Sequence, residues 1–195
     1  MKFVLATFNR DKVREMRNRL RRYRIELIAY GEMQGVSSPV ETGATLLENA
    51  RLKAKAALES TGLPAIADDT GLEIDALSGR PGVRSARYAG PGASDRRNVD
   101  VVLEQLSKVP RGARSARFRT VMVACFPDQP EIVVEGVLEG AITDSPRGQG
   151  GFGYDPIFEV AGDGRTLAEL SLEEKTRISH RTHALDALMR EIGLG

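Results

Sequence analysis

The chain of 195 residues lacks several features that would assign it to a specialised class of protein. It has no tryptophan and only one cysteine, Cys125, so an intrachain disulfide is excluded. No apolar run approaches the ~20 residues that cross a bilayer, and the apolar run near Met1 is too short for a signal peptide. Cys125 lies within TVMVACF, where a buried structural thiol is expected. These absences favour a cytoplasmic globular protein.

An excess of charge of one sign is also missing. Lys and Arg number 28 against 27 Asp and Glu, which gives a formal net charge of +1. Such a balance excludes a strong overall attraction to nucleic acid or to an anionic membrane, so any anion site must be local. The 41% of hydrophobic and 28% of charged residues are globular values, and the length suits a single domain over residues 1–195.

The spacing of apolar residues predicts strands and helices that alternate early in the chain, followed by a pair of strands. The short stretch FPDQP between the paired strands favours an antiparallel connection. The pattern therefore indicates an α/β fold with a mixed sheet. The expected strands are 2–7, 25–29, 65–68, 116–126 and 131–143, and the expected helices follow residue 12, cover 43–60 and 95–107, open at Ser171 and cover 180–192.

Two adjacent carboxylates, Asp68 and Asp69, follow the apolar run Ala65-Ile66-Ala67. We expect the strand to end there, so that both side chains lean into a crevice at the carboxyl edge of the sheet, where α/β folds bind ligands. Two close carboxylates repel each other unless a cation neutralises them, and Mg²⁺ is the oxygen-seeking cation that suits such a pair. A solvated turn at Thr70-Gly71 is the alternative interpretation.

A second candidate site covers Thr7 to Lys12, where a strand end leads into a helix. Free backbone N–H groups and the helix dipole favour an anion at this junction, and Lys12 adds a full positive charge. The segment lacks the glycines of a P-loop, and an ordinary capped helix start is the alternative. Further on, Asn49 and Lys53 border the apolar face of the helix at 43–60, where Lys53 can bury its stem and present its ammonium to a cleft.

A third candidate is the glycine-rich stretch from Gly148 to Gly153, which matches GxGxxG. A dinucleotide site is rejected because the stretch runs into Tyr154 and Pro156, and the proline blocks an early helix. The glycines instead allow the backbone to pass close to a flat ligand, on which Phe152 and Tyr154 could stack. Packing in the core is the alternative for both rings.

The fourth candidate lies near the start of the last helix, where His180 and Arg181 follow Lys175. The helix dipole disfavours positive charge at this end, which makes sense when an anion or a carbonyl oxygen is bound nearby. Taken together, paired acids, cations on separate segments and a glycine-aromatic loop suit a phosphorylated, flat ligand with a divalent metal.

The order of six motifs resembles the inosine/xanthosine triphosphate pyrophosphatase family. Its opening block, T-x-N-x-x-K-x-x-E, is matched by TFNRDKVRE, and its other blocks are matched in order by ETGATLLENARLKA, PAIADDTGLEIDAL, PGVRSARYAG, GGFGYDPIF and SLEEKTRISHR. The resemblance runs from residue 3 to about 190. It implies an elongated mixed β-sheet flanked by helices, two lobes around a central active-site cleft, and a homodimer.

The resemblance also implies an activity and a set of site residues. The activity is Mg²⁺-dependent hydrolysis of ITP, dITP and XTP to the monophosphate and pyrophosphate, which cleanses the nucleotide pool. Asp69 is the implied general base, and Glu41 and Asp69 are the implied Mg²⁺ ligands. As a separate hypothesis, we expect Asp68 to help hold metal or lysine. The implied substrate-binding residues are Thr7, Phe8, Asn9, Arg10, Asp11, Lys12, Lys53, Thr70, Phe152, Gly153, Tyr154, Asp155, Lys175, His180 and Arg181.

Two other classes of protein remain as alternatives. One is a nucleotide- or RNA-binding module that uses the arginines near 17–24 and 111–119, although the neutral net charge and the lack of interleaved aromatics disfavour RNA. The other is a Mg²⁺-dependent phosphatase of the haloacid dehalogenase type. That chemistry needs a D-x-D spacing, whereas Asp68 and Asp69 are contiguous.

Overall fold

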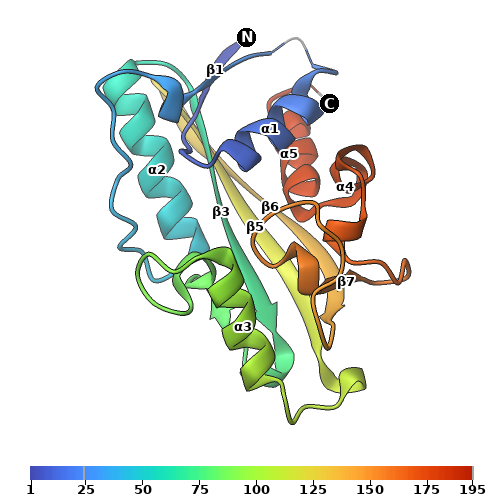
Figure 1. Cartoon of the computed structure of the whole chain (residues 1–195). Coiled ribbons are helices and arrows are strands. Elements are labelled where there is room, and N and C mark those ends of the chain that lie inside the picture. Colours follow the sequence, from blue (N-terminus) through green and yellow to red (C-terminus); the bar gives the residue numbers. More distant parts are fainter. Residues whose placement is uncertain (24, 195) are drawn as a thin grey trace. The chain divides into compact units, whose positions relative to one another are not determined.

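A computed structural model describes residues 1–23 and 25–194 of the chain (Figure 1). Arg24, one of the arginines near 17–24 in the alternative RNA-binding interpretation, lies outside the described residues. The strands are β1 (Lys2–Leu5), β2 (Glu26–Ala29), β3 (Ala65–Ile74), β4 (Pro81–Gly82), β5 (Ser115–Phe126), β6 (Gln129–Ile142) and β7 (Phe158–Val160). The α-helices are α1 (Arg10–Leu20), α2 (Leu46–Thr61), α3 (Asp95–Gln105), α4 (Leu172–Ile178) and α5 (His180–Glu191).

The strands form a mixed sheet in the order β2-β1-β3-β5-β6-β7, and β4 pairs with β3. Strand β1 is parallel to β2 and to β3, whereas β4 is antiparallel to β3 and β7 is antiparallel to β6. Strands β5 and β6 are neighbours joined only by Pro127 and Asp128, a connection that antiparallel strands alone permit. The predicted α/β class, a mixed sheet with flanking helices, is confirmed.

Several helices begin at the capping residues that the sequence predicts. Ser171 and Glu174 form the expected capping box of α4, and Ser94 caps α3. Helix α2 begins three residues later than expected, at Leu46, because Thr45 caps it and closes a capping box with Glu48.

The structure bears on two expectations about apolar segments. Cys125 is a free, buried thiol near the end of β5, as its apolar surroundings predict. Within residues 1–23 and 25–194, every helix is too short or too polar to span a bilayer.

The described chain consists of two compact units. Unit 1 comprises Met1–Asp69, Thr120–Gly136 and His180–Gly195, and unit 2 comprises Thr70–Arg119 and Val137–Ser179. Each unit has its own apolar core. That residues 1–195 act as a single domain stays a prediction.

In unit 1, helices cover both faces of the sheet, with α2 on one face and α1 and α5 together on the other (Figure 1). The α2 face packs through small residues, since Ala50, Ala54 and Ala57 meet Ala65 and Ala67 of β3. These alanines let α2 approach the strand closely. On the opposite face larger side chains interdigitate, namely Phe3, Leu5, Val13, Met16, Ile66, Met122, Leu185, Leu188 and Met189.

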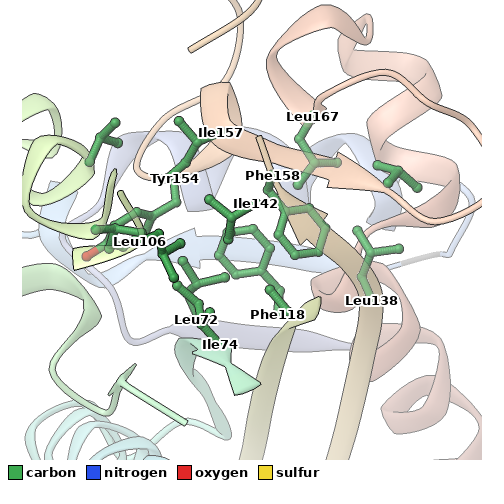
Figure 2. Close-up of a cluster of buried hydrophobic side chains, with 14 of the residues drawn as sticks. Leu72, Ile74, Leu106, Phe118, Leu138, Ile142, Tyr154, Ile157, Phe158 and Leu167 are labelled. Atoms are coloured by element: carbon green, nitrogen blue, oxygen red, sulfur yellow. The ribbon is translucent and has the colours of Figure 1, made fainter. Parts of the chain in front are cut away.

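Unit 2 packs around large aromatic and aliphatic side chains (Figure 2). The rings of Phe118 and Phe158 are tilted by 46°, and their centroids lie 4.6 Å apart. Leu72 and Ile74 from β3 and Leu106 after α3 are fully buried in the same cluster. This core fixes the second half of β3 and the segment that carries Tyr154.

The predicted end of a strand at Asp68 is wrong, because β3 continues through both acids to Ile74. Gly71 forms no turn there. A Cβ atom at this position would lie 2.7 Å from the carbonyl oxygen of Gly82, so the glycine admits β4 beside β3. The predicted solvated turn is wrong for the same reason, and Asp68 is only 1% exposed. A Thr-Gly pair that is typical of turns is here held extended by pairing with a distant strand.

Candidate functional site

Asp68 and Asp69 belong to opposite faces of the sheet in unit 1, because neighbouring side chains alternate along a strand. Asp68 shares its face with Ile66, which packs with α1 and α5, and Asp69 shares its face with Ala67, which packs with α2. The expectation that both carboxylates lean to the same side is therefore wrong. Each acid meets its own set of partners.

Asp68 is held between two cations from two helices. Its Oδ2 lies 2.8 Å from Nζ of Lys12 on α1 and 3.3 Å from Nε of Arg181 on α5. The Arg181 guanidinium is also paired with Glu15, one helical turn beyond Lys12. All four side chains have little exposure to solvent, so the two acids and two cations neutralise one another inside the unit.

Burial alone would raise the pKa of Asp68, but the positive charges of Lys12, Arg181 and Lys53 lower it far below its ordinary value. Burial lowers the pKa of Lys12, and Lys53 and Arg181 add to this shift, although Asp68 opposes it. Asp68 is consequently a permanent anion and a poor proton acceptor. Its geometry makes it an electrostatic anchor for Lys12 and Arg181.

The start of α1 is a well-capped helix terminus. The Asn9 side chain accepts hydrogen bonds from the backbone N–H groups of Asp11 and Lys12, at 2.9 and 3.2 Å. The N–H of Asn9 in turn donates to Oγ1 of Thr7 at 3.2 Å. These donors are already used within the segment, and the Lys12 ammonium is paired with Asp68.

Asp69 is held from two sides by α2. Its Oδ1 lies 2.8 Å from Nζ of Lys53, and its Oδ2 accepts a hydrogen bond of 3.3 Å from Nδ2 of Asn49. Lys53 also contacts Oε1 of Glu41 at 3.0 Å. The prediction that Lys53 buries its stem at the border of this helix agrees with its low exposure. Two acids thus share one ammonium group.

Burial raises the pKa of Asp69 above its ordinary value, even though Lys53 opposes this shift. For Lys53, burial would lower the pKa, but the carboxylates of Asp69, Asp68 and Glu41 raise it overall. Asp69 therefore has a raised pKa and lies beside a lysine whose positive charge is stabilised.

The pair Glu41 and Asp69 fits a metal that arrives with a phosphate. Both carboxylates converge on the Lys53 ammonium and so lie within reach of a single cation. Over the described residues, no group of three or more His, Cys, Asp and Glu side chains could hold a metal by itself. Mg²⁺ is commonly bound by one or two carboxylates together with substrate phosphates, which matches this donor set.

The predicted site residues of the glycine-aromatic loop gather in unit 2. Nζ of Lys175 lies 2.5 Å from Oδ2 of Asp155 and 4.7 Å from the centre of the Phe152 ring. Asp155 also accepts a hydrogen bond of 2.9 Å from the Phe152 N–H. Gly153 has a φ of 61°, which favours glycine, and its N–H donates to Asp95 at 2.8 Å. The loop is thus fixed by two carboxylates.

Tyr154 packs in the core of unit 2, so the packing alternative holds for this ring. Its hydroxyl donates to the carbonyl oxygen of Ser85 at 2.8 Å, and burial raises the pKa of the phenol. Phe152 is partly exposed.

The two units divide the predicted site residues between them. In unit 1, ion pairs join Lys12, Asp68 and Arg181 in one group and Glu41, Lys53 and Asp69 in another. Unit 1 also holds Thr7, Phe8, Asn9, Arg10, Asp11 and His180, and unit 2 holds Thr70, Phe152, Gly153, Tyr154, Asp155 and Lys175.

Four of these residues have surroundings other than the two groups of ion pairs described above. Phe8 is 42% exposed and meets the Tyr30 ring edge-on, with centroids 5.8 Å apart. Arg10 is exposed, and Asp11 forms a surface ion pair with Arg14. His180 is buried at the start of α5.

Glu15, Asn49 and Asp95 are polar contacts outside the predicted set of site residues, although Glu15 ends the block TFNRDKVRE and Asn49 was placed beside Lys53 on its helix face. Helical spacing offered a signal for two of them. Glu15 is three residues after Lys12, and Asn49 is four residues before Lys53, so each shares a helix face with a predicted site lysine. Asp95 carried no such signal, because its partner Gly153 is distant in the sequence.

The model of the Ham1 family matches residues 3–191 of the chain. A dITP/XTP pyrophosphatase of Shigella flexneri is 50% identical over 190 residues, which are 96% of each protein. One of Methylococcus capsulatus is 50% identical over 189 residues, 96% of this chain and 94% of that protein.

Solved structures of Ham1 proteins are also similar to this chain. A HAM1 protein from Coxiella burnetii is 45% identical with a TM-score of 0.88, and the Staphylococcus aureus Ham1 protein is 38% identical with a TM-score of 0.86. Each comparison covers 98% of both chains. The matches therefore include the residues of both units.

Proposed function

Because this chain belongs to the Ham1 family, we propose that it is a nucleoside-triphosphate pyrophosphatase, a hydrolase that acts on a phosphoanhydride bond. The substrates are deaminated purine nucleotides, ITP, dITP and XTP, and the products are the monophosphate and pyrophosphate. The name of the Shigella flexneri relative, dITP/XTP pyrophosphatase, supports this choice. The observation that carries the proposal is the convergence of Glu41 and Asp69 on Lys53.

Asp69 acts as the general base. Its carboxylate is buried, its pKa is raised, and its two oxygens are held by Lys53 and Asn49. A base with a raised pKa takes a proton from water more readily than an ordinary aspartate does. Such proton transfer contributes about 10²- to 10⁴-fold in rate. Lys12 and Lys53 supply the positive charge that a triphosphate needs.

Glu41 and Asp69 would hold Mg²⁺. When bound, the metal polarises phosphate oxygens and stabilises the charge that develops on them. Asp68 is engaged by Lys12 and Arg181, so its contribution is to hold these cations in place.

Base selection follows from the polarity of hydrogen bonds. Hypoxanthine and xanthine carry a carbonyl oxygen where adenine has an amino group, so donors from His180, Arg181 or the backbone would be left unpaired against ATP. An unmet buried donor costs about 1–3 kcal/mol. The family resemblance assigns the binding of the nucleotide to the loop from Phe152 to Asp155, together with Thr70 and Lys175.

We further expect a cytoplasmic homodimer without nucleic-acid or membrane partners.

The ion pairs of the arginines give no support to an RNA-binding module. Arg17 is paired with Glu32, and Arg19 with Asp186. In the second arginine-containing stretch, 111–119, Arg117 is paired with Asp75. These three carboxylates reduce the positive charge that the two stretches present to a phosphate backbone.

One assay distinguishes the candidate functions. The purified chain is mixed separately with ITP, XTP, ATP and GTP in the presence of Mg²⁺, and the products are identified by phosphorus NMR. We expect pyrophosphate and the monophosphate from ITP and XTP, and no turnover after the metal is chelated. Free orthophosphate would indicate a phosphatase, and binding without turnover would indicate a binding module.

A further inference from the structure

Asn49 is fully buried, at 0% exposed, and both ends of its amide are used. Its Nδ2 donates to Oδ2 of Asp69 at 3.3 Å, and its Oδ1 accepts from the backbone N–H of Gly43 at 2.8 Å. The orientation of the amide follows from chemistry. The Gly43 N–H can only donate, so the oxygen must face Gly43 and the amino group must face Asp69.

The segment before α2 is fastened at several points. The N–H groups of Ala44 and Thr45 donate to the Glu48 carboxylate at 2.6 and 3.1 Å. At Gly43, a Cβ atom would lie 2.6 Å from Oδ1 of Asn49, so only glycine permits this approach. Glu41, two residues earlier, contacts the same Lys53 ammonium as Asp69.

We propose that Asn49 is a positioning residue, whose single amide fixes the Asp69 carboxylate relative to the Glu41-bearing loop. Lys53 and Asn49 hold one oxygen of Asp69 each, which sets the plane of the carboxylate. An amide is rigid and planar, so a shift of the loop at Gly43 is transmitted to Asp69. This inference rests on the proposed function for the roles of Asp69 and Glu41.

The chain contains a matched control for this arrangement. Asn98 on α3 is also buried, and its Oδ1 accepts from the Ala89 N–H at 2.8 Å while its Nδ2 donates to the Ala86 carbonyl at 3.2 Å. It links a helix to a loop by the same two bonds, but neither partner is an acid. Loss of Asn98 therefore reproduces the structural effect without the effect on Asp69.

The test compares Asn49→Ala, Asn49→Asp and Asn98→Ala by two measurements. These are kcat and KM for ITP, and the hydrogen exchange of the Gly43 amide followed by NMR. Asn49→Ala should lower kcat about 10- to 100-fold, as loss of a residue that orients a ligating group does. KM should change much less, and Gly43 should exchange faster.

Asn49→Asp separates the two bonds of the amide. It retains an oxygen that accepts from Gly43, so exchange there should stay slow. It also replaces the amino group that donates to Asp69 with a carboxylate, which repels Asp69. The kcat should therefore be lowered, as in Asn49→Ala. Asn98→Ala should leave both kcat and Gly43 exchange unchanged.

Wild-type kcat in Asn49→Ala, or unchanged exchange at Gly43 in that variant, would overturn the inference. The contrast between Asn49→Ala and Asn98→Ala decides this even if Asn49→Asp does not fold. Failure of the wild-type chain to release pyrophosphate from ITP would instead reject the proposed function. Gly43 exchange would then decide alone whether Asn49 holds the loop.

Discussion

In unit 1, the adjacent residues Asp68 and Asp69 lie on opposite faces of the sheet, and their pKa values are shifted in opposite directions. Asp68 lies with Lys12, Arg181 and Glu15, where two acids balance two cations. Asp69 lies with Glu41 and Lys53, where two acids share one cation. The pKa of Asp68 is accordingly lowered, whereas burial raises the pKa of Asp69. The balanced face suits stability, and the acid-rich face suits proton transfer and metal binding.

The largest effect on turnover is expected from Asp69→Asn. The amide cannot accept a proton from water, so kcat for ITP should fall by about 10²- to 10⁴-fold or beyond detection. The fold should remain intact, as checked by circular dichroism and thermal melting. A variant with nearly normal kcat would remove Asp69 from the role of base.

The largest effect on stability is expected from the same substitution one residue earlier, Asp68→Asn. It leaves Lys12 and Arg181 buried without their shared anion, and breaking a buried pair in this way costs about 3–5 kcal/mol. Urea unfolding of both variants measures the difference. Equal losses of stability for Asp68→Asn and Asp69→Asn would contradict the contrast between the faces.

Lys53→Ala should lower kcat/KM for ITP by about 100-fold, which is typical for loss of one preorganised positive contact. It leaves Glu41 and Asp69 to repel each other without their shared cation. Lys55→Ala, an exposed position on the same helix, is the control and should have wild-type kinetics. Unchanged kcat/KM in Lys53→Ala would place this lysine outside the reaction.

A smaller effect concerns the width of the pH profile of kcat/KM, which reports the ionisable groups of the free enzyme. Activity should rise as Asp69 loses its proton, at a pH above the 3.8 of an ordinary aspartate, because burial raises its pKa. It should fall as Lys12 loses its charge, at a pH below the 10.5 of an ordinary lysine, because burial lowers its pKa. Both limbs therefore move inward. Limbs at the ordinary values would indicate that burial does not shift the pKa of either group in the free enzyme.

The sequence predicted the features that depend on local pattern. The mixed sheet followed from apolar periodicity, the start of α4 from its capping box, and the burial of Lys53 from its place on a helix face. Long-range partners were beyond its reach. The strand was expected to end at Asp68 and Asp69 because the pairing of β3 with β4 depends on residues ten positions away, and both acids were therefore expected to lean into the same crevice.

The pairing of Glu15 with Arg181 illustrates the same limit. This ion pair joins α1 to α5, which are far apart in the sequence, so no spacing within either helix predicts it. The apolar residues of α1 and α5 share one core in the structure, but the sequence did not show which charges would be buried with them. Burial of a charge is decided by tertiary structure, since it needs a partner at the right place.

The contrast between the two acids is tested most directly by carbon NMR of the aspartate carboxyl groups as the pH is lowered. The account predicts that the Asp69 carboxyl titrates above the value of an ordinary aspartate, while the Asp68 carboxyl stays ionised until the chain unfolds. Titration of both groups together, or of Asp68 before Asp69, would contradict it.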